Sequence, residues 1–296
     1  MTQFLSLLVN GLSLGAIYAL IALGFVIIFK ASEVVTFMQG SLLLLGAYLI
    51  ARLHDSIGFW PAVIVGLLGT AAASVAMERL VISRLRGAPT ISLAIVTIGA
   101  DLILLTELTR RIGSDILSAG HPWGGDSIRF GGVGIPTNRV LAILVAGILI
   151  GAFFAAFKYS SWGVAMRAAA EDGEAAALMG IRLGRVSMTA WAIAGVLAAT
   201  AGLFAIGSPT PGATPAVSLV ALSAIPAAIL GGLDSTGGAL VGGLIIGVAE
   251  TMAAGYQDDL LFLGRGFGSV VPYVVMVAVL LVRPSGLFGT RDVTRV

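Results

Sequence analysis

The chain has 296 residues, of which 58% are hydrophobic and only 11% are charged. A soluble domain carries roughly a quarter charged residues, so the charges here are too few to cover a water-exposed surface of this size. The net charge of +2 without a long basic run argues against nucleic-acid binding, and the absence of cysteine excludes disulfides and thiolate chemistry.

Apolar stretches of membrane-spanning length recur along the chain. A spanning helix needs about 20 mostly apolar residues, and this criterion predicts about nine crossings. The expected spans lie, in chain order, at Leu7–Phe29, Val34–Ala51, Ile57–Met77, Ile91–Thr106, Val140–Phe157, two within Val186–Leu233, Ser235–Ala254 and Val270–Val282. We therefore expect an all-α fold, a polytopic transmembrane helix bundle with some broken or half helices, forming a single transmembrane domain over residues 1–296.

The distribution of lysine and arginine predicts the orientation of this bundle. With the polar stretch between the fifth and sixth spans placed inside, the inner loops hold 11 of the 17 basic residues and the outer loops hold 6. Cytoplasmic loops of membrane proteins carry such an excess. We expect an external N-terminus, a cytoplasmic C-terminus and an odd number of spans.

Glycine is frequent, with 40 residues, many of them inside the expected spans. Small residues let helix backbones approach closely in lipid, so the composition predicts tight helix crossings.

Polar residues inside the expected spans are the candidates for a solute pathway. Gln39 followed by Gly40 predicts a broken helix, whose free backbone groups can contact a substrate. Asn10, Tyr18 and Thr97 are weaker candidates, because each can equally make a hydrogen bond between helices.

Two acidic residues also fall within expected spans. Asp101 would cost about 2.5–3.5 kcal/mol at the bilayer centre, so we expect it to face protein, a wet cavity or an interface. Glu250 lies near the outer end of its span, where packing, capping and transport are equally open as roles.

Motifs for chemistry of the chain's own are absent. A phosphate-binding loop requires Gly-Lys followed by Ser or Thr, whereas the two lysines, Lys30 and Lys158, each follow a phenylalanine. No Gly-x-Ser-x-Gly or His-Glu-x-x-His motif occurs, and His54 and His121 are too far apart in sequence to suggest a metal cluster. We expect no catalytic residue, no metal and no ATPase site in this chain.

The longest polar interruption lies between the fifth and sixth expected spans. It predicts a helix, a break at Asp172 and Gly173, and a short Ala-rich helix ended by Gly180 at the C′ position. Arg167 and Glu171 are spaced i,i+4 and share one face of the first helix. Physical grounds leave two interpretations open: an amphipathic segment at the lipid headgroups, or a docking helix for a cytoplasmic partner.

This segment resembles the Glu-Ala-Ala loop of ABC-importer permeases. From Arg167 to Ile181, the pattern Arg-Ala-x-x-Glu-Asp-x-Glu-Ala-Ala-x-Leu-Met-Gly-Ile is similar to that of the branched-chain amino-acid (LIV-type) permease family, and the compact N-terminus resembles the smaller of its two permease types. Further similar elements follow the family's order along nearly the whole chain, at Asn10–Leu20, Val35–Tyr48, Leu230–Glu250 and Arg283–Gly289. The departures from the family pattern are Thr36, Met38, Asp101, Glu107 and Ser223, the last at a position where many members carry lysine.

The resemblance implies a permease subunit of an ATP-driven importer in a bacterial or archaeal cytoplasmic membrane. The implied partners are a second permease subunit, two cytoplasmic ATPase subunits that use the ATP, and an extracytoplasmic solute-binding protein. Residues 158–185 would form the cytoplasmic coupling loop, with the coupling residues Arg167, Glu171, Asp172, Gly173, Ala176 and Gly180. The solute would be a branched-chain amino acid or a similar small polar solute such as urea, an amide or a carboxylate. The alternative is an autonomous secondary transporter or channel.

Overall fold

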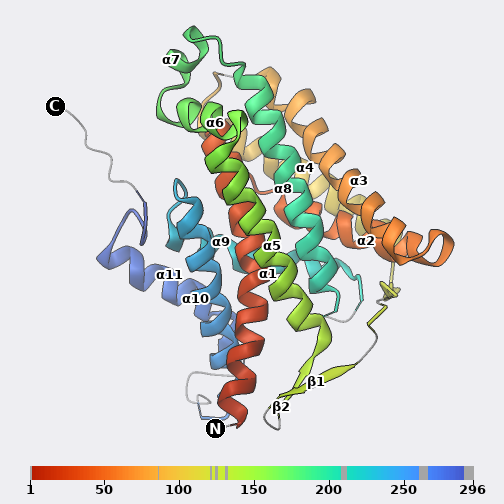
Figure 1. Ribbon diagram of the computed structural model, residues 1–296. Coiled ribbons are helices and arrows are strands. Elements are labelled where there is room, and N and C mark those ends of the chain that lie inside the picture. Colours follow the sequence, from red (N-terminus) through yellow and green to blue (C-terminus); the bar gives the residue numbers. More distant parts are fainter. Residues whose placement is uncertain are drawn as a thin grey trace.

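The structure is a computed structural model that describes residues 2–85, 87–120, 122–123, 126–130, 133–207, 212–259 and 266–289. Helices account for most of it, and the prediction of an all-α polytopic bundle is confirmed (Figure 1). The helices in chain order are α1 (Thr2–Ser32), α2 (Gln39–Ile57), α3 (Phe59–Leu80), η1 (Ile82–Leu85), α4 (Thr90–Ile112), α5 (Thr137–Tyr159), α6 (Ser161–Glu171), α7 (Gly173–Leu178), α8 (Leu183–Ala205), η2 (Pro215–Ser218), α9 (Leu219–Gly231), α10 (Thr236–Gly255), η4 (Phe267–Ser269) and α11 (Val271–Val282).

Six helices in the described ranges are long and apolar enough to cross a membrane, namely α1, α3, α4, α5, α8 and α10. The expected count of about nine crossings is not confirmed. Helices α9 and α11 have 13 and 12 residues. At 1.5 Å per residue they are about 20 Å and 18 Å long, shorter than the hydrocarbon core of about 30 Å. Helix α2 has 19 residues, but its last turns carry Arg52, His54 and Asp55.

The boundary of α2 also differs from the prediction of a span at Val34–Ala51. Residues 33–37 are not helical, and α2 begins at Gln39 and continues to Ile57. The apolar criterion counts side chains and cannot detect a break in backbone hydrogen bonding. The break itself was expected, because Gln39 and Gly40 predict a discontinuity in this region.

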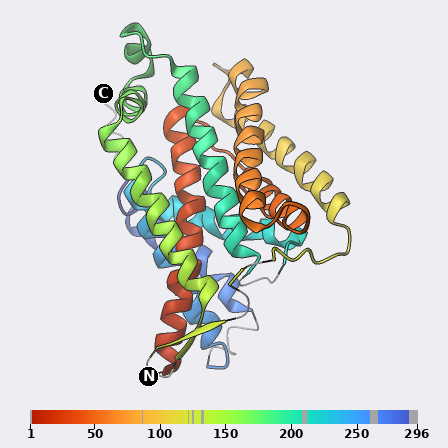
Figure 2. The ribbon, with the colours of Figure 1, turned by 45° about the vertical axis from the view of Figure 1, so that its right-hand side comes forward.

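Helix α1 runs through the length of the bundle and is buried along most of it, with α5 and α8 beside it (Figure 2). Its closest packing is against α10, through glycines on both helices. A Cβ added at Gly247 would lie 2.2 Å from the backbone nitrogen of Gly15, and one added at Gly243 would lie 2.5 Å from the nitrogen of Ala19. The backbones touch without side chains between them, which confirms the tight helix crossings that the glycine content predicts.

A small antiparallel hairpin, β1 (Ser127–Phe130) and β2 (Val133–Pro136), interrupts the helices and was not expected. It lies at the end of the bundle where the N-terminus is found, whereas α6 and α7 project from the opposite end (Figure 1). The proline-rich sequence between α8 and α9 favours a turn, but residues 208–211 lie outside the described ranges; Pro215 begins η2.

Candidate functional site

Helix α6 is fixed to the end of α5 by a side-chain cap and by one arginine. The hydroxyl of Ser160 accepts a hydrogen bond from the N–H of Gly163 at 3.0 Å, which caps the first turn. Nη1 of Arg167 donates to the carbonyl of Phe157, and its guanidinium lies 5.2 Å from the centre of the Phe157 ring. Met166, the residue before it, is fully buried. Arg167 therefore positions α6 against the membrane-spanning helix that precedes it.

The predicted break between the two short helices is present at Asp172. This residue is extended, with φ −154°, and its Oδ1 accepts a hydrogen bond from the N–H of Ala175 at 2.9 Å. Gly173 is the first residue of α7. A carboxylate at a helix N-terminus satisfies a free N–H group and interacts favourably with the helix dipole. The sequence Glu-Asp-Gly thus ends one helix and begins the next within three residues.

The predicted end of α7 at Gly180 is also confirmed. Gly180 has φ +86°, a left-handed conformation that favours glycine. Its N–H donates to the carbonyl of Ala177 and the N–H of Ile181 donates to that of Ala176, both at 3.0 Å, which is the Schellman pattern. Ala176 is only 5% exposed, so it anchors α7 to the protein.

The tip of this helix pair is apolar and exposed. Leu178 is 89% exposed and Met179 is 84% exposed, and both stand at the last turn of α7. The two side chains are adjacent in sequence and are held in place by the capped ends of the helix. The arrangement presents a small, rigid apolar surface beyond the end of the bundle, where α6 and α7 project (Figure 1).

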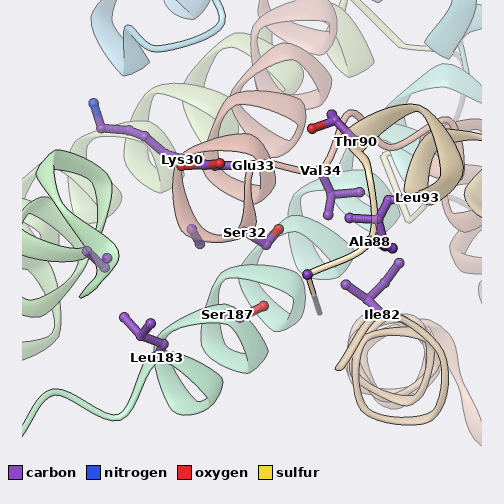
Figure 3. A pocket seen from close by; sticks show the side chains of 14 residues that line it. Lys30, Ser32, Glu33, Val34, Ile82, Ala88, Thr90, Leu93, Leu183 and Ser187 are labelled. Atoms are coloured by element: carbon purple, nitrogen blue, oxygen red, sulfur yellow. The ribbon is translucent and has the colours of Figure 1, made fainter. Parts of the chain in front are cut away.

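Two cavities lie next to the helix pair. The smaller, of about 300 Å³, lies beneath Ala169 and Gly173 and between the end of α1, the start of α4 and α8. Figure 3 shows Val34, Ala88 and Ser187 around it.

The larger cavity has a volume of about 830 Å³. Arg167 and Glu171 both line it, as expected for residues that share a face. Lys30 lines it from the end of α1, and its Nζ donates to the carbonyl of Asp234 at 2.7 Å. The larger cavity therefore lies between α6, the end of α1 and the loop between α9 and α10.

The break between α1 and α2 is held by α4. Glu33 adopts φ +54°, a left-handed conformation that is uncommon for a residue other than glycine. The N–H of Phe37 donates to Oγ1 of Thr97 at 3.2 Å, and the N–H of Ser41 donates to Oδ1 of Asp101 at 3.1 Å. Met38 at the start of α2 provides no side-chain cap. Asp101 therefore caps α2 from a neighbouring helix, which explains an acidic residue within a span.

Gln39 is fully buried at this break, and neither polar atom of its amide has a hydrogen-bond partner within the described residues. A Cβ added at Gly24 would lie 2.6 Å from its Nε2, and one added at Gly40 would lie 3.0 Å from the carbonyl oxygen of Ser218. Unsatisfied buried polar groups cost about 1–3 kcal/mol, so the Gln39 amide destabilises this break unless it gains a partner. Thr97 also lies at this break, because its Oγ1 accepts the hydrogen bond from the N–H of Phe37.

The other two predicted pathway residues lie in a different region. Tyr18 is 3% exposed, and its hydroxyl donates to Oε2 of Glu250 at 2.7 Å, which joins α1 to α10. Asn10 lines a cavity that Glu250 also lines, together with Arg139 from the start of α5. The five predicted pathway residues thus form two groups, one at the α1–α2 break and one where α1 meets the C-terminal half of α10.

Three features of this arrangement were not singled out from the sequence: the exposed Leu178 and Met179, the capping role of Asp101, and Arg139. A signal for Arg139 was present, because a charged residue directly precedes the expected span at Val140 in a chain with few charges. The backbone group that Asp101 caps and the residues that share a cavity with Arg139 lie far away in sequence, and local patterns do not reveal them.

A bundle of membrane-length helices with a buried polar break and a projecting helix pair is compatible with a transport permease. The chain belongs to the family of permease components of branched-chain amino acid transport systems, whose family model matches residues 7–280.

The chain is similar to curated members of this family over almost its full length. It is 32% identical to the high-affinity branched-chain amino acid transport system permease protein LivH of Salmonella typhimurium, over 99% of this chain and 98% of LivH. It is 29% identical to the corresponding protein BraD of Pseudomonas aeruginosa with the same coverage. It is 31% identical to the probable branched-chain amino acid transport permease protein LivH of Methanocaldococcus jannaschii, over 91% of this chain and 88% of that one. No solved structure matches the chain.

Proposed function

We propose that this chain is the membrane-spanning permease subunit of an ATP-driven ABC importer for branched-chain amino acids or a similar small polar solute. It acts in a bacterial or archaeal cytoplasmic membrane with the N-terminus outside and the C-terminus inside. Its partners are a second permease subunit, two cytoplasmic ATPase subunits and an extracytoplasmic solute-binding protein. ATP is bound and hydrolysed by the partner subunits, and this chain has no ATPase site or cofactor of its own. The family membership and the names of the relatives support this assignment.

The exposed tip of α7 is the observation that carries the proposal. Leu178 and Met179 are large apolar side chains in contact with little of this chain, on a helix that is capped at both ends. An apolar tip on a rigid support fits into a complementary apolar socket, and in this proposal the socket is on the ATPase subunit. Residues 158–185 are then the coupling loop.

The contacts that anchor the coupling loop connect it to the membrane-spanning helices. Arg167 ties α6 to the carbonyl of Phe157, and the cavities next to α6 are bordered by the end of α1. A displacement of the α7 tip by the ATPases therefore moves α6 against Lys30 and the break between α1 and α2. The break contains Gln39 and Gly40, so the pathway residues respond to the position of the coupling loop.

Affinity purification of the complex tests the proposal. The ATPase subunits are expected to co-purify with the unaltered chain and with Glu174→Ala, a change on the same helix that leaves the tip intact. Leu178→Asp places a charge in the apolar contact and is expected to lower ATPase recovery about tenfold or more. Equal recovery with Leu178→Asp would contradict the proposed docking surface. Solute uptake by the chain alone in liposomes would instead support an autonomous transporter or channel.

A further inference from the structure

A cavity of about 390 Å³ opens at the end of the bundle opposite to α6 and α7. It is lined from three helices, α1, α5 and α10, which meet at the end that holds the N-terminus and the β-hairpin (Figure 1). Its polar lining consists of one cationic, one anionic and three neutral residues, namely Arg139, Glu250, Asn10, Ser13 and Thr251.

The two charges in this cavity are not neutralised by each other. Nε of Arg139 is buried and has no hydrogen-bond partner within the described residues. Among those residues the carboxylate of Glu250 receives a hydrogen bond only from Tyr18, on Oε2, which leaves Oε1 as an acceptor. No ion pair joins Arg139 and Glu250 in the described part of the chain.

Unpaired charges in a membrane protein are costly and are expected to face a functional cavity. A single ligand that carries both a negative and a positive group would pair both residues at once.

We infer that this cavity binds the zwitterionic head group of an α-amino acid. The carboxylate of the solute is placed on Arg139, whose guanidinium forms paired hydrogen bonds with carboxylates, and the ammonium group is placed on Oε1 of Glu250. The neutral side chains of Asn10, Ser13 and Thr251 complete the polar contacts. Leu7, Leu14 and Ala254 line the same cavity and supply an apolar surface for an aliphatic side chain. This assignment rests on the proposed function and narrows its solute class.

The two charged residues in the cavity lining discriminate among the solute classes that the sequence leaves open. Urea and simple amides carry no charge and would leave both Arg139 and Glu250 unpaired. A carboxylate without an amino group would pair Arg139 but would place a second negative charge next to Glu250. An amino acid is the candidate that neutralises both residues.

Photo-crosslinking of the assembled transporter tests the site directly. The probe is a leucine analogue with a diazirine in its side chain, applied to the complex in lipid nanodiscs and followed by mass spectrometry of the cross-linked peptides. We expect cross-links to Leu7, Leu14 or Ala254 that excess leucine suppresses. Arg139→Gln and Glu250→Gln are each expected to lower the yield about tenfold or more, since each removes one charged contact. Glu107→Gln, which changes an exposed acid on α4 outside the cavity, is the matched control and is expected to leave the yield unchanged.

Competition with leucine analogues separates the roles of the two charges. Leucinamide lacks the carboxylate, and 4-methylpentanoate lacks the ammonium group. In Arg139→Gln the advantage of leucine over leucinamide is expected to disappear, and in Glu250→Gln the advantage of leucine over 4-methylpentanoate is expected to disappear. A general loss of folding would instead lower competition by all three compounds together, and the melting temperature of each variant identifies that case.

The outcome also distinguishes this inference from the proposed function. Cross-links that fall elsewhere, or that persist in both charge variants, would overturn the amino-acid site while ATP-driven uptake remained intact. Failure of the ATPase subunits to co-purify with the unaltered chain would overturn the proposed function instead.

Discussion

The close crossing of α1 and α10 predicts that two Gly→Ala substitutions, one inside the crossing and one outside it, differ strongly in their effect on the free energy of unfolding. A Cβ added at Gly247 would lie 2.2 Å from the nitrogen and 2.3 Å from the Cα of Gly15. Carbon atoms pack at about 3.5–4.0 Å, so Gly247→Ala forces the two helix backbones apart by more than about 1 Å. Such overpacking costs about 1–3 kcal/mol. Both contacting atoms belong to the backbone, and no side chain can rotate away to relieve the contact.

Gly147→Ala is the matched control, because a Cβ at Gly147 in α5 meets no atom within 4 Å. Both changes replace a glycine within a helix, so the gain in helix propensity, about 1 kcal/mol, is shared and cancels in the comparison. The difference between the variants is then the packing cost alone. Titration with SDS in mixed micelles, followed by circular dichroism, measures the free energy of unfolding of each variant. Equal unfolding free energies for Gly247→Ala and Gly147→Ala would refute the close backbone crossing.

Three further predictions concern residues at the ends of helices. Asp101→Ala removes the cap on α2 and is expected to cost about 1 kcal/mol and to speed hydrogen exchange of the Ser41 amide; unchanged exchange at Ser41 would disprove the cap. Asp172→Ala is expected to destabilise α7 by about 1 kcal/mol and to lower ATP-driven uptake, while Asp172→Ser, which retains an acceptor, preserves uptake. Gly180→Val forces a branched residue into φ +86° and is expected to cost about 1–2 kcal/mol, seen as faster proteolysis of the segment; proteolysis at the rate of the unaltered chain would contradict it.

Features that depend on local sequence were largely predictable. The break at Asp172 and the end of α7 at Gly180 follow from capping residues within a few positions of the atoms that they satisfy. The close packing of α1 on α10 follows from glycines spaced at Gly11, Gly15, Gly243 and Gly247, although their pairing could not be deduced. Local patterns were sufficient wherever the partner atoms lie within one or two helical turns.

Features that depend on distant partners were not predictable. The α1–α2 break is held by Thr97 and Asp101, each 60 residues from the backbone group that it binds. The count of about nine crossings is not confirmed, because the 20-residue criterion measures apolar length and does not detect where the backbone leaves the helical conformation. The shared cavity of Arg139 and Glu250 joins helices that are remote in sequence, so neither residue alone indicates a charged site.

Labelling of a single cysteine at the tip of α7 tests the central claim most directly. The chain has no cysteine, so Met179→Cys provides one reactive thiol at a position that is 84% exposed. A membrane-impermeant maleimide is expected to label this thiol in inverted membrane vesicles stripped of ATPase subunits, and not in right-side-out vesicles. Adding back the ATPase subunits is expected to block the labelling. Labelling from the outer face, or labelling that the ATPase subunits leave unchanged, would contradict the assignment of α6 and α7 as the coupling segment of an ATP-driven permease.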